Sequence, residues 1–261
     1  TVDLDDWASN RDGVPREKLD VQPDPVPALA GEIATLSEGA FKALDDLTVL
    51  GRSRRTSKFS AAGRELRRTG LIDDPGALTE TGEWVAAHLR DGRHMAVAAN
   101  SSPPQLLTLW VSDMTVLAIS HLTDAATGRI THRIVHCLTD DIPRLVFMWL
   151  ELQPSWDMTF EITCSQAEFI AKLQSGVPPG TVPDGDATEF TRRRWVAVSL
   201  IGPDDDKDAP EVAWAMARPR RVALLMEGTD ADRVVVSRNP AEPFWQVLTR
   251  ALLNLAEEEE P

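Results

Sequence analysis

Two histidines, a cluster of aspartates and a run of cations are the residues whose types and spacing could do chemistry. His132 and His136 form an H-x-x-x-H pair, which can bind one metal ion when it lies on a helix. The surrounding segment RITHRIVHCL has the composition of a strand, on which residues four positions apart are about 13 Å apart. One ion cannot bridge that distance, so the pattern predicts no metal site here.

The aspartate-rich segment 204–208 (DDDKD) has a composition that could suggest calcium. A calcium loop of the EF-hand type needs Gly at its sixth position and Glu at its twelfth. Counted from the first of these aspartates, those positions hold Ala209 and Ala215. We therefore expect a solvated hairpin loop.

The sequence has none of the familiar catalytic motifs. It contains no phosphate-binding Gly loop, no Walker lysine and no G-x-S-x-G elbow. Cys137 and Cys164 lack C-x-x-C spacing, which favours reduced core residues over a disulfide or a nucleophile. We expect a binding protein that is not an enzyme and uses no cofactor.

Composition narrows the class of partner. The net charge of -14 opposes binding to nucleic acid and to acidic membrane surfaces. No apolar run approaches the roughly 20 residues that a membrane helix needs, and the acidic start TVDLDDWASN does not resemble a secretory signal. These features predict a soluble, cytoplasmic chain whose partner is another protein.

One stretch of the sequence is basic, in contrast to the acidic chain as a whole. Residues 52–68 contain seven cations and Glu65 as their one acid. The following LRRTGLIDDPGALTETGEWVAAHL resembles the recognition helix, wing and last helix of a winged-helix DNA-binding regulator, whose basic helix enters the major groove. An amphipathic helix with a cationic face, paired with the protein's own acids, is the other interpretation.

The predicted helices and strands that must position these residues fall into two successive groups along the chain, which we call the first and the second series. Residues 1–31 are acidic and Pro-containing, which predicts a flexible arm. Apolar spacing predicts a helix from about Leu36, a second helix after Ser60 and a third capped by Thr79 or Thr81. Strands are predicted at the apolar segments 95–99, 105–112, 115–122 and 129–138, before a helix that contains Pro143 in its first turn.

The second series begins with a strand near 157–163. Ser165 and Glu168 then form a capping box for a helix, and residues 175–187 predict a mobile loop. Strands follow at 195–202, 212–217, 221–226 and 233–237, and a helix is predicted from about Ala241 to Glu257.

The two series repeat one order of motifs. Thr-x-Ser-x-x-x-Phe-x-Ala occurs at residues 35–43 and again at 163–171. VLAISHLTDA (residues 116–125) parallels VALLMEGTDA (residues 222–231), Trp110 parallels Trp214, and Pro143 parallels Pro243. We predict an α+β fold of two quasi-equivalent halves (32–153 and 154–257) related by an approximate two-fold. Each half would be an antiparallel sheet with helices.

The predicted C-terminal helix is the candidate partner-binding element. Its apolar residues cover an arc of about 160°, wider than one packing seam requires. Internal packing of both edges is the favoured explanation of this arc. If part of the face docks a helical partner, Trp245, Leu248 and Leu252 are the candidate contact residues.

Three segments resemble the EspG family, the chaperones of actinobacterial and mycobacterial type VII secretion. TLSEGAF (residues 35–41) and TCSQAEF (residues 163–169) are similar to the family's LT-x-x-E-F helix start. LRRTGLIDDPGAL (residues 66–78) is similar to its L-x-x-x-G-L-x-D-x-x-G-x-L segment. The resemblance spans most of residues 33–255, while Thr79–Gly82 and the acidic ends depart from it.

The resemblance implies a binding function in the cytoplasm. Family members hold the tip of a helical secreted heterodimer of the PE/PPE type, cover apolar surface that would aggregate, and deliver the client for export. The resemblance also implies a quasi-two-fold pair of sheet-and-helix halves. The competing function is a winged-helix DNA-binding regulator with an α+β sensing domain.

Overall fold

The computed structural model describes residues 31–50, 59–100, 104–124, 126–151, 161–180, 186–201, 213–218, 222–230 and 232–238, together with residues 57, 182, 246, 249 and 250. The fold is α+β, as predicted, and its named strands form one antiparallel sheet. No helix in this described part of the chain is long and apolar enough to cross a bilayer.

The first series of elements begins with a strand. Its strands are β1 (Gly31–Ser37), β2 (Arg93–Asn100), β3 (Gln105–Ser112), β4 (Thr115–Thr123) and β5 (Ile130–Leu138). Its helices are α2 (Glu38–Leu50), α3 (Ala61–Arg68), α4 (Glu80–Asp91), the 3-10 turn η1 (Thr139–Asp141) and α5 (Ile142–Trp149).

The second series is shorter but follows a similar order. Its strands are β6 (Glu161–Ser165), β7 (Arg194–Ile201), β8 (Ala213–Arg218), β9 (Val222–Asp230) and β10 (Arg233–Arg238). Its helices are α6 (Gln166–Ser175) and α7 (Asp186–Arg192), and both lie between β6 and β7.

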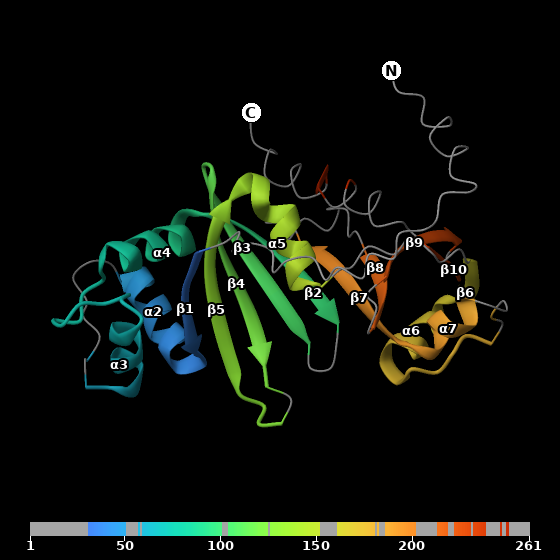
Figure 1. The fold of residues 1–261 in the computed structure, drawn as a ribbon, viewed down its shortest axis with the longest axis horizontal. Coiled ribbons are helices and arrows are strands. Elements are labelled where there is room, and N and C mark those ends of the chain that lie inside the picture. The colour runs from blue at the N-terminus through green and yellow to red at the C-terminus, as the bar shows by residue number, and fades with distance from the viewer. Residues whose placement is uncertain are drawn as a thin grey trace, which may run out of the picture.

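The strands form a single ten-stranded sheet in the order β1-β5-β4-β3-β2-β7-β8-β9-β10-β6. In each series the first strand pairs back onto the last, so that β1 and β6 are the two edges. The antiparallel pair β2 and β7 joins the two series at the centre. In Figure 1, α2, α3 and α4 lie at one end of the sheet, α6 and α7 at the other, and α5 between them.

The sheet has two apolar faces, because successive strand residues point in opposite directions. On β4, Val116 and Ala118 belong to the cluster that contains α5. Leu117 and Ile119, the residues next to them, pack instead with α2, α3 and α4. A strand buried on both faces is continuously apolar, which explains the run VLAIS in β4.

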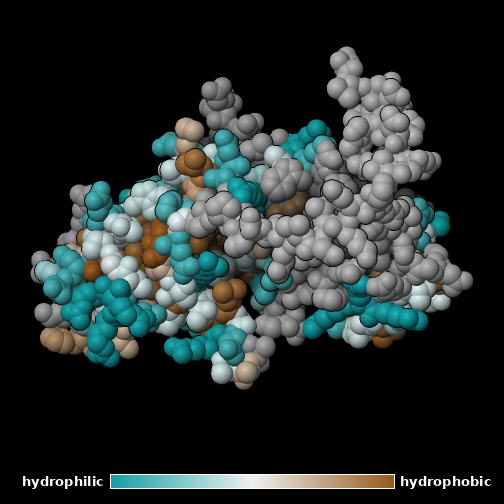
Figure 2. Space-filling view, in the orientation of Figure 1, coloured by the Kyte–Doolittle hydropathy of each residue, from teal (hydrophilic) through white to brown (hydrophobic). Residues whose placement is uncertain are grey.

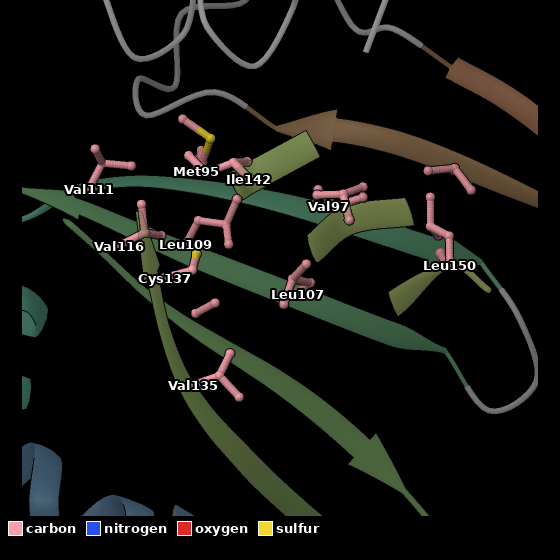
Figure 3. Close-up of a cluster of buried hydrophobic side chains, with 14 of the residues drawn as sticks. Met95, Val97, Leu107, Leu109, Val111, Val116, Val135, Cys137, Ile142 and Leu150 are labelled. Carbon is pink, nitrogen blue, oxygen red and sulfur yellow. The ribbon is translucent and has the colours of Figure 1, made fainter. Parts of the chain in front are cut away.

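The α5 cluster extends across the centre of the sheet (Figure 3). Met95 and Val97 of β2 and Val196 and Val198 of β7 all belong to it. One packed core therefore crosses the junction between the two series. Pro143 lies in the first turn of α5, as predicted, where its missing N–H costs no helical hydrogen bond.

A third cluster occupies the other end of the sheet. Phe169 of α6 and Phe190 of α7 pack around Trp195, which is fully buried on β7. Val196, the next residue, belongs to the α5 cluster. Hence α6 and α7 pack on the face opposite α5.

Several predicted boundaries are corrected by the structure. The helix expected from Leu36 begins at Glu38, because residues 31–37 form β1 and pair with β5. The arm predicted over 1–31 thus overlaps a strand at Gly31, and residues 1–30 lie outside the described residues. Helix α7 begins at Asp186, inside the stretch predicted as a loop to residue 187.

Candidate functional site

Equivalent strand–helix junctions open the two series. Ser37 ends β1, and its Oγ accepts a hydrogen bond from the N–H of Ala40 in the first turn of α2, at 3.3 Å. Ser165 ends β6, and its Oγ accepts from the N–H of Glu168 at 3.2 Å, completing the predicted capping box. The motif Thr-x-Ser-x-x-x-Phe therefore marks the same local structure twice.

The segment 66–78 forms a tight corner between α3 and α4. Gly70 and Gly76 have φ of 75° and 87°, values that favour glycine. Leu66 and Leu71 are fully buried, and the Asp73 carboxylate accepts a hydrogen bond from the N–H of Ala77 at 2.7 Å. The spacing of Leu, Gly, Leu, Asp and Gly thus corresponds to specific turn and packing positions.

The α3 surface is a cluster of exposed cations at one helix. We use this name for Phe59, Arg64, Arg67 and Arg68, all of which are exposed. Phe59 is 77% exposed, and its carbonyl accepts a hydrogen bond from the guanidinium of Arg64 at 2.5 Å. An exposed aromatic residue and exposed cations therefore belong to one surface.

Glu65, the one acid of the basic stretch, turns away from the α3 surface. Its two carboxylate oxygens accept hydrogen bonds from the N–H and the Oγ–H of Ser37, each at 2.7 Å. Among the described carboxylates, none forms an ion pair with Arg64 or Arg68. Arg64 and Arg68 are therefore not neutralised by Glu65.

Carboxylates border the α3 surface at its C-terminal end. Asp73 and Asp74 lie in the turn that follows α3, and Asp74 has its carboxylate 3.4 Å from the guanidinium of Arg67. The Asp74 side chain is 87% exposed. A single bridge between Ile72 and Leu78 is the one β pairing of the segment predicted as a wing.

His132 and His136 lie on a strand, as predicted, and differ in their surroundings. His132 is buried and stacks on Phe41 of α2, with ring centroids 4.3 Å apart. Its ring also meets the edge of His121 at 4.7 Å. Burial, with a smaller contribution from His121, lowers the pKa of His132 to about 4, so this imidazole is neutral at neutral pH.

The other histidines of this region make structural contacts. His88 of α4 has its Nδ1 3.0 Å from the carbonyl of Trp84, to which it donates, and its Nε2 3.0 Å from Oγ1 of Thr115. His136 is exposed and lies against the edge of Trp84. Within the described ranges, no group of three or more His, Cys, Asp or Glu residues could hold a metal ion.

The two cysteines are buried and free, as predicted. Burial raises the pKa of Cys137 to about 12 and raises that of Cys164 above its usual value, with smaller contributions from nearby carboxylates. Both are therefore thiols at neutral pH, whereas a nucleophilic cysteine needs its thiolate.

Lys172 on α6 is a buried cation that the sequence pattern did not single out. Its ammonium donates hydrogen bonds to the carbonyls of Gly176 and Thr191, near the ends of α6 and α7. It also lies 5.6 Å from the ring centroid of Trp195. Burial lowers the pKa of this ammonium, and its contacts join two helices without forming a reactive site.

Several predicted features lie outside the described residues. They are the contact candidates Trp245, Leu248 and Leu252, the aspartate-rich segment 204–208, and the cations Arg52, Arg54, Arg55 and Lys58. The α3 surface is the part of the predicted basic stretch that the structure places, and the exposure of its Phe59 could not be deduced from helical spacing. Neither a scan of protein-family models nor a search of curated proteins finds a match to this chain.

Proposed function

We propose that this protein is a cytoplasmic chaperone or adaptor, similar to the EspG family, that binds helical secreted proteins of a type VII system and performs no catalysis. The observation that carries the proposal is the corner at 66–78, where Gly70, Leu71, Asp73 and Gly76 each occupy a position that the motif's residue type suits. The residues that carry the resemblance to the EspG family thus have roles in the fold, which supports the proposal.

The proposal includes an approximate two-fold relation between the two series. Strand pairing supports it, since Ser37 pairs with Thr131 where Ser165 pairs with Arg233. The strand pairings can be followed from each edge of the sheet to its centre, and residues at the same step then count as equivalent. On this basis Val97 of β2 is equivalent to Leu200 of β7, and these two residues also pair with each other. An axis normal to the sheet would pass between these two residues.

The same pairing corrects two details of the proposed repeat. Trp110 pairs with Leu117, and the corresponding β8 position is Ala215, which pairs with Leu224. The match of Trp110 with Trp214 is therefore one residue out of register. The match of segment 116–125 with 222–231 is displaced by the same single residue, because side-by-side alignment of apolar strands does not reveal their pairing.

The proposed activity is the covering of apolar surface on the client and involves no chemical reaction. A helical secreted pair exposes apolar surface before export, and such surface drives aggregation. A folded protein with a net charge of -14 that covers this surface would keep the complex dispersed by charge repulsion. No reactive group is needed for that task.

Affinity capture tests the proposal. The tagged full-length chain is recovered from the cytosol of its native cell, and the co-eluting proteins are identified by mass spectrometry. We expect small helical secreted proteins in near-stoichiometric amounts. Recovery of background proteins alone, under conditions that preserve weak complexes, contradicts the proposal.

A winged-helix DNA-binding regulator is the second candidate function. The observation in its favour is the exposure of Arg64, Arg67 and Arg68 on α3, followed by the bridge between Ile72 and Leu78. Such a protein would bind duplex DNA with an affinity that falls steeply as salt rises. Titration of duplex DNA at two salt concentrations distinguishes the two functions.

A further inference from the structure

We propose that the α3 surface is a docking site for an acidic segment of a partner protein, one that carries an apolar residue among its carboxylates. Figure 2 shows hydrophilic side chains gathered at the end of the molecule where Figure 1 places α3, with apolar side chains among them. The inference goes beyond the proposed function, because it needs neither secretion nor a helical heterodimer.

Charge is the first argument. Three arginines are exposed on α3. Arg67 pairs with Asp74, and Glu65, the carboxylate within α3 itself, is held by Ser37. Guanidinium groups bind carboxylates through paired N–H donors more strongly than they bind neutral acceptors. Arg64 and Arg68, which form no ion pair with a described carboxylate, are therefore matched to an acidic ligand.

The exposed ring is the second argument. Phe59 is 77% exposed, and its backbone carbonyl accepts a hydrogen bond from the guanidinium of Arg64. Exposed aromatic rings beside arginines are typical of the residues that dominate binding energy in protein interfaces. An exposed ring on a surface with exposed arginines suits a ligand that has both an apolar side chain and carboxylates.

The border of the surface favours a protein segment over DNA. A wing would approach the phosphate backbone, but the turn after α3 carries Asp73 and Asp74, and Asp74 is 87% exposed. Carboxylates at that place repel phosphate. Within the described residues, the arginines of this surface lie on one short helix, which suits a short acidic segment.

Fluorescence anisotropy with three labelled probes tests the inference on the full-length protein. The probes are a short peptide repeating Glu-Glu-Leu, the same peptide with Gln for Glu, and a short duplex DNA. We expect the acidic peptide to bind most tightly and the Gln peptide at least about tenfold more weakly, since it lacks the charge-assisted hydrogen bonds.

Two sets of variants locate the binding. R64E/R68E should weaken the acidic peptide at least about tenfold, and F59A should weaken it severalfold. R129E/R192E makes the same change in net charge at exposed positions elsewhere and should leave binding unchanged. An unchanged melting temperature of each variant excludes unfolding as the cause.

The inference is overturned by any of three results. These are no binding of the acidic peptide, equal binding of the Gln peptide, or equal weakening by R129E/R192E. Tighter binding of the duplex, lost in R64E/R68E, overturns it in favour of the regulator. None of these results bears on capture of secreted proteins, so the proposed function is judged separately.

Discussion

Glu65 of α3 caps α2 across space by binding Ser37 through both of its carboxylate oxygens, each at 2.7 Å. At the corresponding junction of the second series, Glu168 binds the N–H and Oγ of Ser165 from within its own helix, each at 2.8 Å. Ala40 occupies the position in α2 that Glu168 occupies in α6, and it has no acceptor to offer. The two junctions therefore use the same carboxylate contact, supplied from different places in the chain.

The Glu65–Ser37 contact predicts a stability effect. We expect Glu65→Ala to lower the free energy of unfolding by about 1–3 kcal/mol, because the N–H and O–H of Ser37 lose a charged acceptor. Urea denaturation measures the change. Asp46→Ala, an exposed substitution on α2, is the control and should stay within about 0.5 kcal/mol. An equal effect of the two substitutions would contradict the prediction.

His132 predicts a loss of stability in acid. Its folded pKa of about 4 lies below the ordinary value of 6.5, so the unfolded chain binds the proton more tightly. The stability contributed by the neutral ring is complete above pH 6.5 and is lost as pH falls from 6.5 toward 4. Each pKa unit is worth about 1.4 kcal/mol, which gives a loss of about 3 kcal/mol.

Urea denaturation at several pH values, with a His132→Leu variant, measures this effect. The variant should lose much of the pH dependence below pH 6.5, although His121, whose pKa burial also lowers, contributes in the same direction. His136→Leu, at an exposed position on the same strand, is the matched control. An unchanged pH profile in His132→Leu would show that another group dominates.

Lys172 predicts a difference between two substitutions. Lys172→Met keeps most of the packing against Trp195 but removes the donors to Gly176 and Thr191, and should cost about 1–3 kcal/mol. Lys172→Ala also removes the buried side-chain stem and should cost more. Thermal and urea unfolding measure both, with the exposed Lys42→Met as control. The prediction fails if the Met variant is the less stable of the two.

Gly70 and Gly82 should respond unequally to alanine. A Cβ on Gly70 meets no atom within 4 Å, so the cost is the left-handed backbone alone, about 1–2 kcal/mol. A Cβ on Gly82 would lie 2.1 Å from the carbonyl oxygen of Leu71, which forces backbone to move. We therefore expect Gly82→Ala to be clearly the more destabilising in urea denaturation. Similar losses in both variants would contradict the close contact.

The central pair of strands predicts the behaviour of an isolated half. In a fragment of residues 31–151, β2 becomes an edge strand, and its Val97 and Met95 lose the β7 side of their cluster. Exposed edges of this kind pair with another chain. We expect the fragment to dimerise or aggregate in light scattering, while the full-length chain does not associate through this edge. A folded, monomeric fragment would count against the prediction.

Much of the secondary structure was predictable from the sequence. Ser60, Thr79 and Ser165 cap helices as their patterns indicated, because capping depends on local geometry. Strand β1 was missed because residues 31–37 contain few β-branched residues, and their pairing partner lies in β5. Helix α7 was missed because its seven residues follow a Pro- and Gly-rich stretch with turn signals.

The candidate site was predictable only in part. The run of cations indicated a basic helix, but the inward turn of Glu65 depends on Ser37, which precedes it by 28 positions. Likewise, the burial of Lys172 depends on Trp195 and on the end of α7. Contacts between distant segments decide these orientations, and local spacing does not record them.

The pairing of β1 with β5 has a consequence for the time course of folding. Glu32 on β1 forms its ion pair with Arg133 on β5, and the two residues are 101 positions apart. Contacts of such long range slow the search for the native state, because the intervening chain must first be brought together. During synthesis, β1 therefore cannot pair until β5 has been made, and β2 cannot complete its pairing until β7 has been made. Assembly of the sheet should be the slow step of folding, and its two edge strands should each join last within their own series.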